Sequence, residues 1–369
     1  MKAPERFETV IVGGGQAGLA IGYHLMKRGR PGVILDASER IGDAWRTRWD
    51  SLRLFTPAKY DGLPGWRFPG PGWSFPTKDE MADYLEAYAS RFALDVRTGV
   101  RVDRLSRQGH RFVLTAGERR FEADDVVIAS GAHHIPKVPP FAFDLDRGIV
   151  QMHSKHYRNP SQLREGPVLV VGLGNSGAEI AFELSRRLRT IVAGEPSAQI
   201  PFRHGGFAGR VAIPGVRFLG HHVLTRRTPI GRRLAAKFEH GAAPLIRVRV
   251  KELLAAGVER VPRVIGVRDG LPLLQDGRVL EVSNVIWCTG FRQDLSWIDL
   301  PSFGQTGPPP HVRGVVPSEA GLYFMGLRFQ FSESSDTLVG LDRDGAYVAK
   351  AIALRQERSL LPEDALVTA

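Results

Sequence analysis

Short runs of β-branched residues, each followed by a glycine-rich turn and then by helically spaced apolar residues, occur twice along the chain. In the first copy, residues 9–12 (TVIV) predict a buried strand and 16–28 predict a helix, and 33–36 (VILD) predict a second strand after a Gly/Pro break. The second copy runs through 166–188 and ends in another apolar run at 190–197 (TIVAGEPS). Each copy therefore predicts a strand, a helix and a strand in parallel arrangement.

The segment between the two copies predicts a mixture of loops, one helix and antiparallel strands. Residues 42–76 are dense in Pro, Gly and Trp, which predicts loops. Residues 77–92 predict an amphipathic helix, and Thr77 with Glu80 three positions later predicts a capping box at its start. The alternating pattern at 96–131 predicts short antiparallel strands that end in the apolar run DVVIASG.

The last third of the chain returns to strands after an irregular, basic and aromatic segment at 200–250. The runs VIWCTGF (285–291) and GLYFMGL (321–327) resemble closing strands of the first domain, and a last helix is predicted at about 336–356. We therefore expect the second domain to be inserted into the first. The expected division is 1–145 together with 282–369 for the first domain, and 146–281 for the inserted one.

The first glycine turn has the spacing G-x-G-x-x-G at Gly13, Gly15 and Gly18, with Gln16 and Ala17 opening the helix. In such a turn the first glycine permits the tight bend, the second lets backbone approach a pyrophosphate, and the third lets helix and strand pack closely. Asp36, followed by Ala37, ends the second strand 23 residues after Gly13, which is near the offset of about 20 expected for an acid that binds ribose hydroxyls. This combination predicts a Rossmann-like dinucleotide site.

The second turn repeats the pattern at Gly172, Gly174 and Gly177, with Asn175 and Ser176 between the last two glycines. Glu195 takes the position of the acid, again 23 residues after the first glycine. The fold class is therefore α/β with two Rossmann-like dinucleotide-binding domains of the three-layer type. Two such sites in one chain favour hydride transfer from a nicotinamide in one to a flavin in the other. Duplicated sites without exchange are the weaker interpretation.

Composition narrows the function classes further. The 369 residues are 43% hydrophobic and contain one cysteine, Cys288, which excludes a disulfide framework and multi-cysteine metal sites. The histidine pairs have no partners at metal-ligand spacing, so no metal site is expected. The net charge of +11 is spread along the chain apart from a concentration at 203–251, so we expect no nucleic-acid partner. Without an apolar run of about 18 residues or a leader pattern, we expect no spanning helix and a cytoplasmic location.

At this point the motifs become recognisable as a set. Together they resemble the flavin-containing monooxygenase group of the class B flavoprotein monooxygenases, in its short bacterial form, and the resemblance covers nearly the whole chain. The motifs that carry it are GGGQAG with Asp36, GDAW (42–45), SLRLFTP (51–57), DVVIASG (125–131), HSKHYRNP (153–160), GLGNSGAEIA (172–181) and WCTGF (287–291).

The resemblance implies a role for several residues. The first fingerprint would bind FAD and the second NADPH. Trp45 would lie beside the flavin, and the backbone of Val102 would face the adenine. The segments Ser130-Gly131 and Thr289-Gly290 would line the passages between the domains.

Three departures from the family pattern alter these expectations. Gly148 stands five residues before His153 instead of four, although His153 and Tyr157 keep their spacing, and tyrosine there leans away from typical Baeyer–Villiger enzymes. Pro57 stands where many relatives carry an asparagine beside the flavin. Glu195 stands where relatives often carry arginine; a carboxylate would accept from a ribose 2′-hydroxyl and repel a 2′-phosphate, which favours NADH. Arg203 could still reach a phosphate, so NADPH stays open.

The function implied is oxygenation of a small organic molecule by O₂. NAD(P)H would reduce FAD, O₂ would add to the reduced ring, and the resulting flavin hydroperoxide would give one oxygen to the substrate and release the other as water. The cofactor carries this chemistry, so no catalytic side chain is assigned. The alternative is an NAD(P)H oxidase or flavin-dependent reductase, favoured by the missing asparagine. For the segment 207–238 a structural helix or lid is preferred to peripheral contact with a membrane surface.

Overall fold

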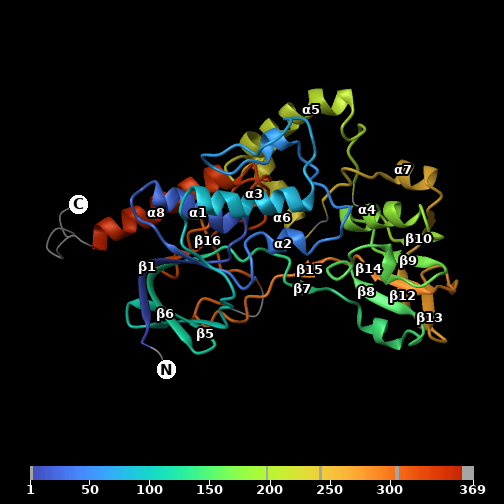
Figure 1. Ribbon diagram of the computed structural model, residues 1–369, viewed down its shortest axis with the longest axis horizontal. Helices are drawn as coiled ribbons and strands as arrows, with labels where there is room; N and C mark the ends of the chain where they lie inside the picture. Colours follow the sequence, from blue (N-terminus) through green and yellow to red (C-terminus); the bar gives the residue numbers. More distant parts are fainter. Residues whose placement is uncertain (1–2, 197, 241–242, 304–306, 360–369) are drawn as a thin grey trace.

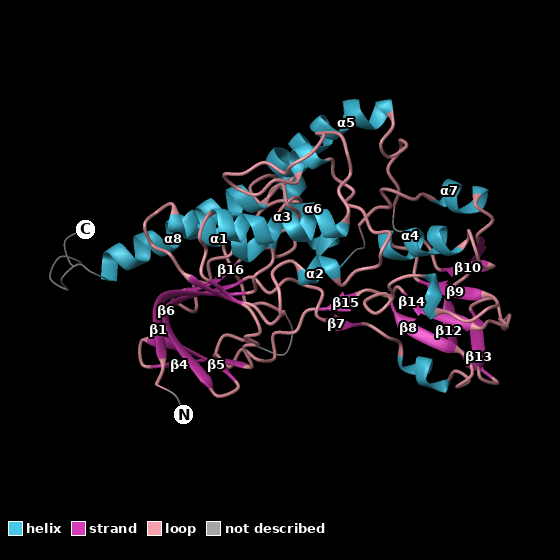
Figure 2. Cartoon of the chain, in the orientation of Figure 1, coloured by secondary structure: helices cyan, strands magenta, loops and turns pink. Residues whose placement is uncertain are grey.

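A computed structural model describes residues 3–196, 198–240, 243–303 and 307–359. Two sheets lie side by side, each covered by helices, and two short strands run between them (Figure 1). The N-terminal sheet lies below α1 (Gln16–Met26), α3 (Lys78–Arg91) and α8 (Leu341–Ser359), and the second sheet lies at the other end of the molecule (Figure 2). The two predicted βαβ units therefore belong to two separate sheets.

The first sheet has seven strands in the order β3-β2-β1-β6-β5-β4, with β16 also paired to β6. The β1–β2, β2–β3, β1–β6 and β6–β16 pairs are parallel, whereas β4, β5 and β6 pair antiparallel. The strands are β1 (Glu5–Val12), β2 (Val33–Leu35), β3 (Val96–Arg97), β4 (Arg104–Gln108), β5 (Arg111–Ala116), β6 (Arg119–Ile128) and β16 (Leu322–Phe324).

Both faces of this sheet are covered, which explains its continuous apolar runs. Ile11 of β1 packs toward α1 (Gln16–Met26), α3 (Lys78–Arg91) and α8 (Leu341–Ser359), while Val10 and Val12 pack on the opposite face. The capping box predicted for α3 is confirmed, because the Thr77 side chain accepts from the Glu80 backbone N–H and the Glu80 carboxylate accepts from the Thr77 N–H. The predicted helix and its start are therefore correct.

The second sheet is wholly parallel, in the order β11-β10-β9-β14-β8. Alternate residues of β9 face opposite layers, one built on α4 and α7 and the other on a β-hairpin and the turn η2. The elements are β8 (Val150–His153), β9 (Val168–Val171), β10 (Thr190–Ala193), β11 (Glu259–Val261), β14 (Asn284–Trp287), α4 (Asn175–Leu184), α7 (Val250–Ala255), the hairpin β12 (Val264–Arg268) and β13 (Leu271–Leu274), and the 3₁₀ turns η2 (Pro140–Asp144) and η3 (Pro160–Gln162).

One part of the expected domain division is wrong. The strand β14, within VIWCTGF, lies between β9 and β8 in the second sheet and does not close the first domain. Its apolar run suits a central parallel strand of either sheet, so the pattern alone could not assign it. The run GLYFMGL does belong to the first sheet, as β16 beside β6. The second sheet thus ends at about residue 288, and the remaining limits stay predictions.

The chain passes between the two sheets twice, and the two passages are paired. The short strands β7 (Ile135–Pro136) and β15 (Phe291–Arg292) are antiparallel partners, and the Lys137 N–H donates to the Gly290 carbonyl at 2.9 Å. They lie between the two sheets (Figure 2). The outgoing and returning segments therefore support each other instead of acting as independent linkers.

Residues 203–240, which we call the arm, extend from the second domain across the first. The prediction of an irregular segment is wrong here, because the arm contains α5 (Phe207–Phe218), the π-helical turn η4 (Leu219–Val223) and α6 (Pro229–His240); helix is thus present within 207–238, whereas its role stays a prediction. The arm is fixed to the first domain by backbone hydrogen bonds: Arg226 N–H donates to Phe331 O at 2.8 Å, and Glu333 N–H donates to Leu224 O at 3.1 Å. The arm thus ties the domains together.

The docking of the arm predicts a pH dependence. Burial and the neighbouring Arg343 lower the pKa of His221 to about 4, and its Nδ1 lies 3.0 Å from Ser334 Oγ. Because the folded-state pKa lies below the ordinary 6.5, the unfolded chain binds more protons between these values. This contribution to stability is complete above pH 6.5 and is lost as the pH falls toward 4. We expect the midpoint of thermal unfolding to fall less over that window in His221→Gln than in the wild type. Equal slopes would contradict the assignment.

Candidate dinucleotide-binding sites

The first glycine turn divides its three glycines into two that packing requires and one that it does not. Gly13 has φ +111°, and a Cβ there would lie 2.5 Å from the Ala129 carbonyl oxygen. A Cβ on Gly18 would lie 1.8 Å from the Gly13 carbonyl oxygen. A Cβ on Gly15 would meet no atom within 4 Å. Folding therefore explains the first and third glycines, whereas the second is open on the side where a ligand would approach.

The second turn repeats this geometry closely. Gly172 has φ +105° and faces the Cys288 carbonyl oxygen, which a Cβ would meet at 2.5 Å. A Cβ on Gly177 would lie 1.9 Å from the Gly172 carbonyl oxygen, and one on Gly174 would again meet nothing within 4 Å. Each open glycine caps the N-terminus of a helix, α1 or α4, where first-turn amides lack intrahelical partners. Both turns have the shape that a pyrophosphate requires.

Asp36 lies at the first turn, as its spacing predicts. Its Oδ2 accepts from the Gly14 N–H at 2.6 Å and its Oδ1 accepts from the Ser38 N–H at 2.7 Å. Each carboxylate oxygen can accept a second hydrogen bond, so the fixed carboxylate can still receive ribose hydroxyls. The next residue, Ala37, is exposed.

Glu195 lies at the second turn, but with a partner that sequence reasoning missed. Arg260 of β11 donates from Nη2 to Glu195 Oε2 at 2.8 Å, and the Glu195 side chain is 66% exposed. Arg203, the cation proposed from the sequence, is exposed at the start of the arm, and no ion pair joins it to Glu195 within the described residues. The signal for Arg260 is its place on the strand parallel to β10, which requires the strand order to be known.

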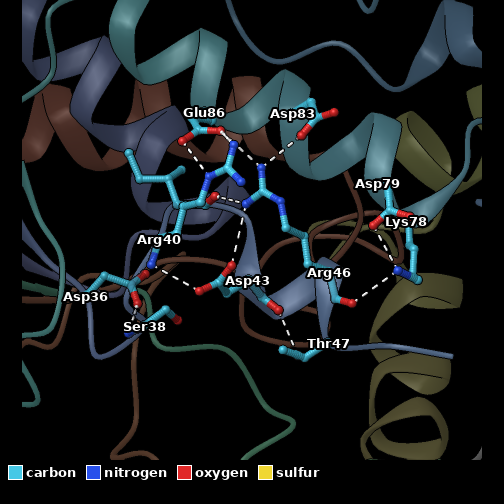
Figure 3. A network of polar contacts seen from close by, with 11 residues as sticks. Asp36, Ser38, Arg40, Asp43, Arg46, Thr47, Lys78, Asp79, Asp83 and Glu86 are labelled. Atoms are coloured by element: carbon cyan, nitrogen blue, oxygen red, sulfur yellow. Dashed lines mark hydrogen bonds and ion pairs between the residues drawn. The ribbon is translucent and has the colours of Figure 1, made fainter. Parts of the chain in front are cut away.

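Trp45 is held beside the first turn by a network that positions α2 (Asp43–Arg46). Its Nε1 donates to Gln16 Oε1 at 3.2 Å. Arg46 reaches α3, donating to Asp83 Oδ1 at 2.9 Å and to Glu86 Oε2 at 3.1 Å (Figure 3). This contact places Trp45 at the first turn, and its position beside the flavin stays a prediction.

Further contacts in the same network fix both ends of α2. Arg40 also donates to Glu86, and its backbone N–H donates to Asp43 Oδ2 at 3.0 Å. Lys78 donates from Nζ to the Arg46 carbonyl at 3.1 Å (Figure 3). These charge-assisted bonds restrain a four-residue helix that would not be stable alone.

The two predicted passage segments lie directly beside the two turns. Ala129-Ser130 contacts Gly13, and Cys288-Thr289 contacts Gly172, which makes the two halves alike. The Gly131 carbonyl accepts from Gln293 Nε2 at 3.2 Å, and the Ser130 carbonyl lies 2.7 Å from His134 Nε2. The segment Ser130-Gly131 is therefore hydrogen-bonded to residues of the two chain segments that connect the domains.

His153 secures the second passage. Its Nδ1 accepts from the Lys155 backbone N–H at 3.1 Å, so the proton is on Nε2, which donates to the Gly290 carbonyl at 3.0 Å. Burial lowers the pKa of His153, which keeps the ring neutral as this arrangement requires. Tyr157, its motif partner, donates to Glu183 Oε2 at 2.8 Å and supports α4. His153 and Tyr157, the two motif residues that keep their spacing, thus have structural roles in this chain.

Three other predicted residues have different surroundings. The Asn175 side chain binds the backbone of residues 244–246: its Oδ1 accepts from the Ile246 N–H and its Nδ2 donates to the Pro244 carbonyl, each at 2.9 Å. Ser176 is half-buried on the first turn of α4. Val102 is half-buried against one core cluster of the first domain. The structure brings Asn175 and Ser176 to the second turn, while Val102 lies on the first domain.

A group of basic side chains surrounds Phe291 where the domains meet. The ring centroids of His133 and His153 lie 5.0 and 4.9 Å from that of Phe291, and Arg48 Cζ lies 5.8 Å from it. No carboxylate among the described residues lies within ion-pair distance of Arg48. Burial lowers the pKa of His133 to about 4, with Arg48 as a second cause. Of this group, His153 and Phe291 belong to motifs recognisable in the sequence, but their proximity to His133 and Arg48 is visible only in the fold.

The described residues contain neither a metal-type cluster nor a membrane-spanning helix. No cluster of three or more His, Cys, Asp or Glu with the geometry of a metal site occurs in them. Their helices include none with both the length and the apolar character needed to span a bilayer.

Comparison with known proteins identifies similar chains. Residues 10–203 match the family model described as pyridine nucleotide-disulphide oxidoreductase. An uncharacterized CzcO-like oxidoreductase of Geobacillus kaustophilus is 36% identical over 348 residues, covering 94% of this chain and 98% of that protein. A probable indole-3-pyruvate monooxygenase of Arabidopsis thaliana, YUCCA3, is 30% identical over 387 residues, covering 94% of this chain and 86% of its own length.

Solved structures agree with this likeness. A flavin-containing monooxygenase from Stenotrophomonas maltophilia is 29% identical and superposes with a TM-score of 0.75, covering 95% of this chain and 99% of the other. Cyclohexanone monooxygenase, at 14% identity and a TM-score of 0.71, shares the fold.

Proposed function

Because the chain belongs to the pyridine nucleotide-disulphide oxidoreductase family and, within it, to the flavin-containing monooxygenase-like proteins, we propose that it is an NAD(P)H-consuming monooxygenase that holds FAD at Gly13–Gly18 and the nicotinamide nucleotide at Gly172–Gly177. The protein is an oxidoreductase of the flavin monooxygenase type. Disulfide reduction is disfavoured, because it requires a thiolate and burial raises the pKa of Cys288, the one cysteine of the chain, to about 12.

The observation that carries the proposal is the pair of open glycines. At both turns the first and third glycines are enforced by backbone contacts below 3 Å, while Gly15 and Gly174 face free space at a helix N-terminus. A turn that only needed to pack would not require the middle glycine. A pyrophosphate that must contact the backbone gives both middle glycines a reason.

The side chains around the turns suit the same assignment. At the first turn, Asp36 would accept the ribose hydroxyls of FAD, and Trp45 with Gln16 would border the ring system. The neutral His153 holds the Gly290 passage toward the second turn. When bound, FAD would supply the hydride acceptor and the activation of O₂. The overall reaction takes NAD(P)H, a proton, O₂ and substrate to NAD(P)⁺, water and oxygenated substrate.

A stopped-flow experiment tests the proposal directly. We expect the purified protein to carry FAD, and NADH or NADPH to bleach the flavin absorbance without oxygen. Admission of air with a ketone, thioether or 2-oxo acid should then give oxygenated product with little hydrogen peroxide. Protein that binds no flavin, or flavin that neither nucleotide reduces, would refute the proposed function.

An oxidase is the second candidate, and one observation favours it. Pro57 is buried where many relatives carry an asparagine. The carbonyl of Phe55, two residues earlier, already accepts a hydrogen bond from His204 Nε2 at 2.8 Å. The expected sign of an oxidase is stoichiometric hydrogen peroxide with every substrate tried. Oxygenated product in excess of peroxide would exclude it.

The Glu195–Arg260 pair predicts how the enzyme distinguishes the two nucleotides. In the wild type the positive charge of Arg260 is balanced by Glu195, so the 2′-phosphate of NADPH would lie close to a carboxylate. In Glu195→Gln the guanidinium becomes available, and a charge-assisted hydrogen bond of about 1.5–3 kcal/mol should favour NADPH over NADH by roughly tenfold or more. Arg260→Gln should lower NADPH affinity alone.

The measurement is the ratio of kcat/KM for NADPH to that for NADH. The matched control is Arg189→Gln, which removes the ion pair with Glu259 at the other end of the same two strands. We expect the control to keep the wild-type ratio. An unchanged ratio in Glu195→Gln would show that the pair lies away from the 2′ position.

A further inference from the structure

Helix α5 of the arm presents an exposed apolar stripe, in which Phe218 also contacts the His222 ring at 4.9 Å between centroids. Phe207, Val211 and Phe218 have exposed fractions of 84%, 67% and 61%, and Pro214 is also exposed. Their spacing of four, seven and eleven residues places all four on one face of the helix. Figure 1 shows α5 at the edge of the molecule, away from both sheets. Four adjacent apolar residues in this position are more than the scattered exposure normal for a surface.

The flank of the stripe faces the first domain and is basic. Arg210 Cζ lies 5.8 Å from the ring centroid of Trp73, and Arg217 Cζ lies 4.7 Å from that of Tyr60. These contacts fix the rotation of α5, and the exposed fractions show that the loop 57–76 does not cover the stripe. Neither arginine has a carboxylate within ion-pair distance in the parts of the chain that are described. The flank therefore keeps its positive charge.

The charge of the segment selects what covers the stripe. The arm contains eight Lys and Arg and a single acid, Glu239. A second copy of the chain would bring two such segments together, and their like charges would oppose the contact. An anionic lipid surface instead complements the arginines and receives the two phenylalanines below the headgroups. No described helix spans a bilayer, so contact of this kind would be peripheral.

We propose that α5 docks the protein onto anionic membrane surfaces, with Phe207, Val211, Pro214 and Phe218 inserted at the interface and the arm's arginines against lipid phosphates. The inference does not depend on the proposed chemistry, because it rests on the exposure and charge of the arm. It gives the exposed helix a ligand of defined class, a bilayer rich in anionic lipid.

Vesicle flotation tests the proposal with the full-length flavoprotein. We expect flotation with phosphatidylcholine vesicles containing about one third phosphatidylglycerol, none with phosphatidylcholine alone, and release at high salt. The variant Phe207→Ser/Phe218→Ser should lose binding by about tenfold or more. Phe143→Ser is the matched control, since Phe143 is 86% exposed on the turn η2 and lies outside the arm. Its binding should equal that of the wild type.

The electrostatic part has its own pair of variants. Arg232→Gln/Arg233→Gln, both exposed in the arm, should weaken flotation, whereas Lys27→Gln/Arg28→Gln, exposed after α1, should not. Equal flavin content and NAD(P)H oxidation without vesicles will establish that each variant folds. Absence of binding to anionic vesicles, or equal loss in both control and stripe variants, would overturn the proposal. A dimer in solution that Phe207→Ser/Phe218→Ser dissociates would also overturn it, since a second copy would then cover the stripe.

Discussion

Substituting alanine for Gly174 is expected to weaken NAD(P)H binding, and so to slow reduction of the bound flavin at low nucleotide concentration, while leaving the flavin in place. The added Cβ meets no protein atom within 4 Å, and Gly174 has φ −93°, which alanine adopts freely, so the fold has no reason to change. The methyl group instead occupies the space where backbone would contact a pyrophosphate. Losing one hydrogen bond to a charged phosphate, about 1.5–3 kcal/mol, corresponds to a roughly 10- to 100-fold weaker nucleotide affinity.

The measurement is the dependence of the anaerobic reduction rate on nucleotide concentration. Gly266→Ala is a suitable control, because Gly266 also lies in the second domain, on β12, with nothing within 4 Å of an added Cβ. We expect wild-type kinetics from it. The equivalent change in the first turn, Gly15→Ala, should weaken flavin retention instead. If Gly174→Ala reduced its flavin at the wild-type rate and concentration dependence, the nucleotide would have to bind elsewhere.

Local rules were sufficient where local contacts decide the structure. The two glycine turns, the strand before each and the helix after each follow from residues within about 25 positions, and the structure contains all of them. The capping box at Thr77 and Glu80 is another short-range signal that the structure confirms. The acids Asp36 and Glu195 lie at the turns because a βαβ unit has a nearly fixed length.

Long-range packing decided the rest, and sequence patterns do not report it. The apolar run of β14 would suit a central strand of either sheet, and only the tertiary fold shows that it pairs with β9 and β8. Arg260 reaches Glu195 because β11 and β10 are neighbours although 65 residues separate the pair. The helix α5 was obscured by Pro214 in its interior, which normally argues against a helix.

Substituting alanine for Gly18 is expected to destabilise the protein severely, because here the glycine serves packing. Its Cβ would lie 1.8 Å from the Gly13 carbonyl oxygen, and neither backbone segment can move without separating α1 from β1. Overpacking of this kind costs about 3 kcal/mol or more, a large part of the roughly 5–15 kcal/mol that stabilises a typical domain. Gly15→Ala lies three residues earlier, where an added Cβ meets no atom within 4 Å, and should change the free energy of unfolding by less than about 0.5 kcal/mol. Urea unfolding of the flavin-free proteins measures both, since bound flavin would itself add stability. Equal unfolding midpoints for the two variants would mean that the turn relaxes around Gly18, and the division of the glycines into packing and ligand-facing positions would then be wrong.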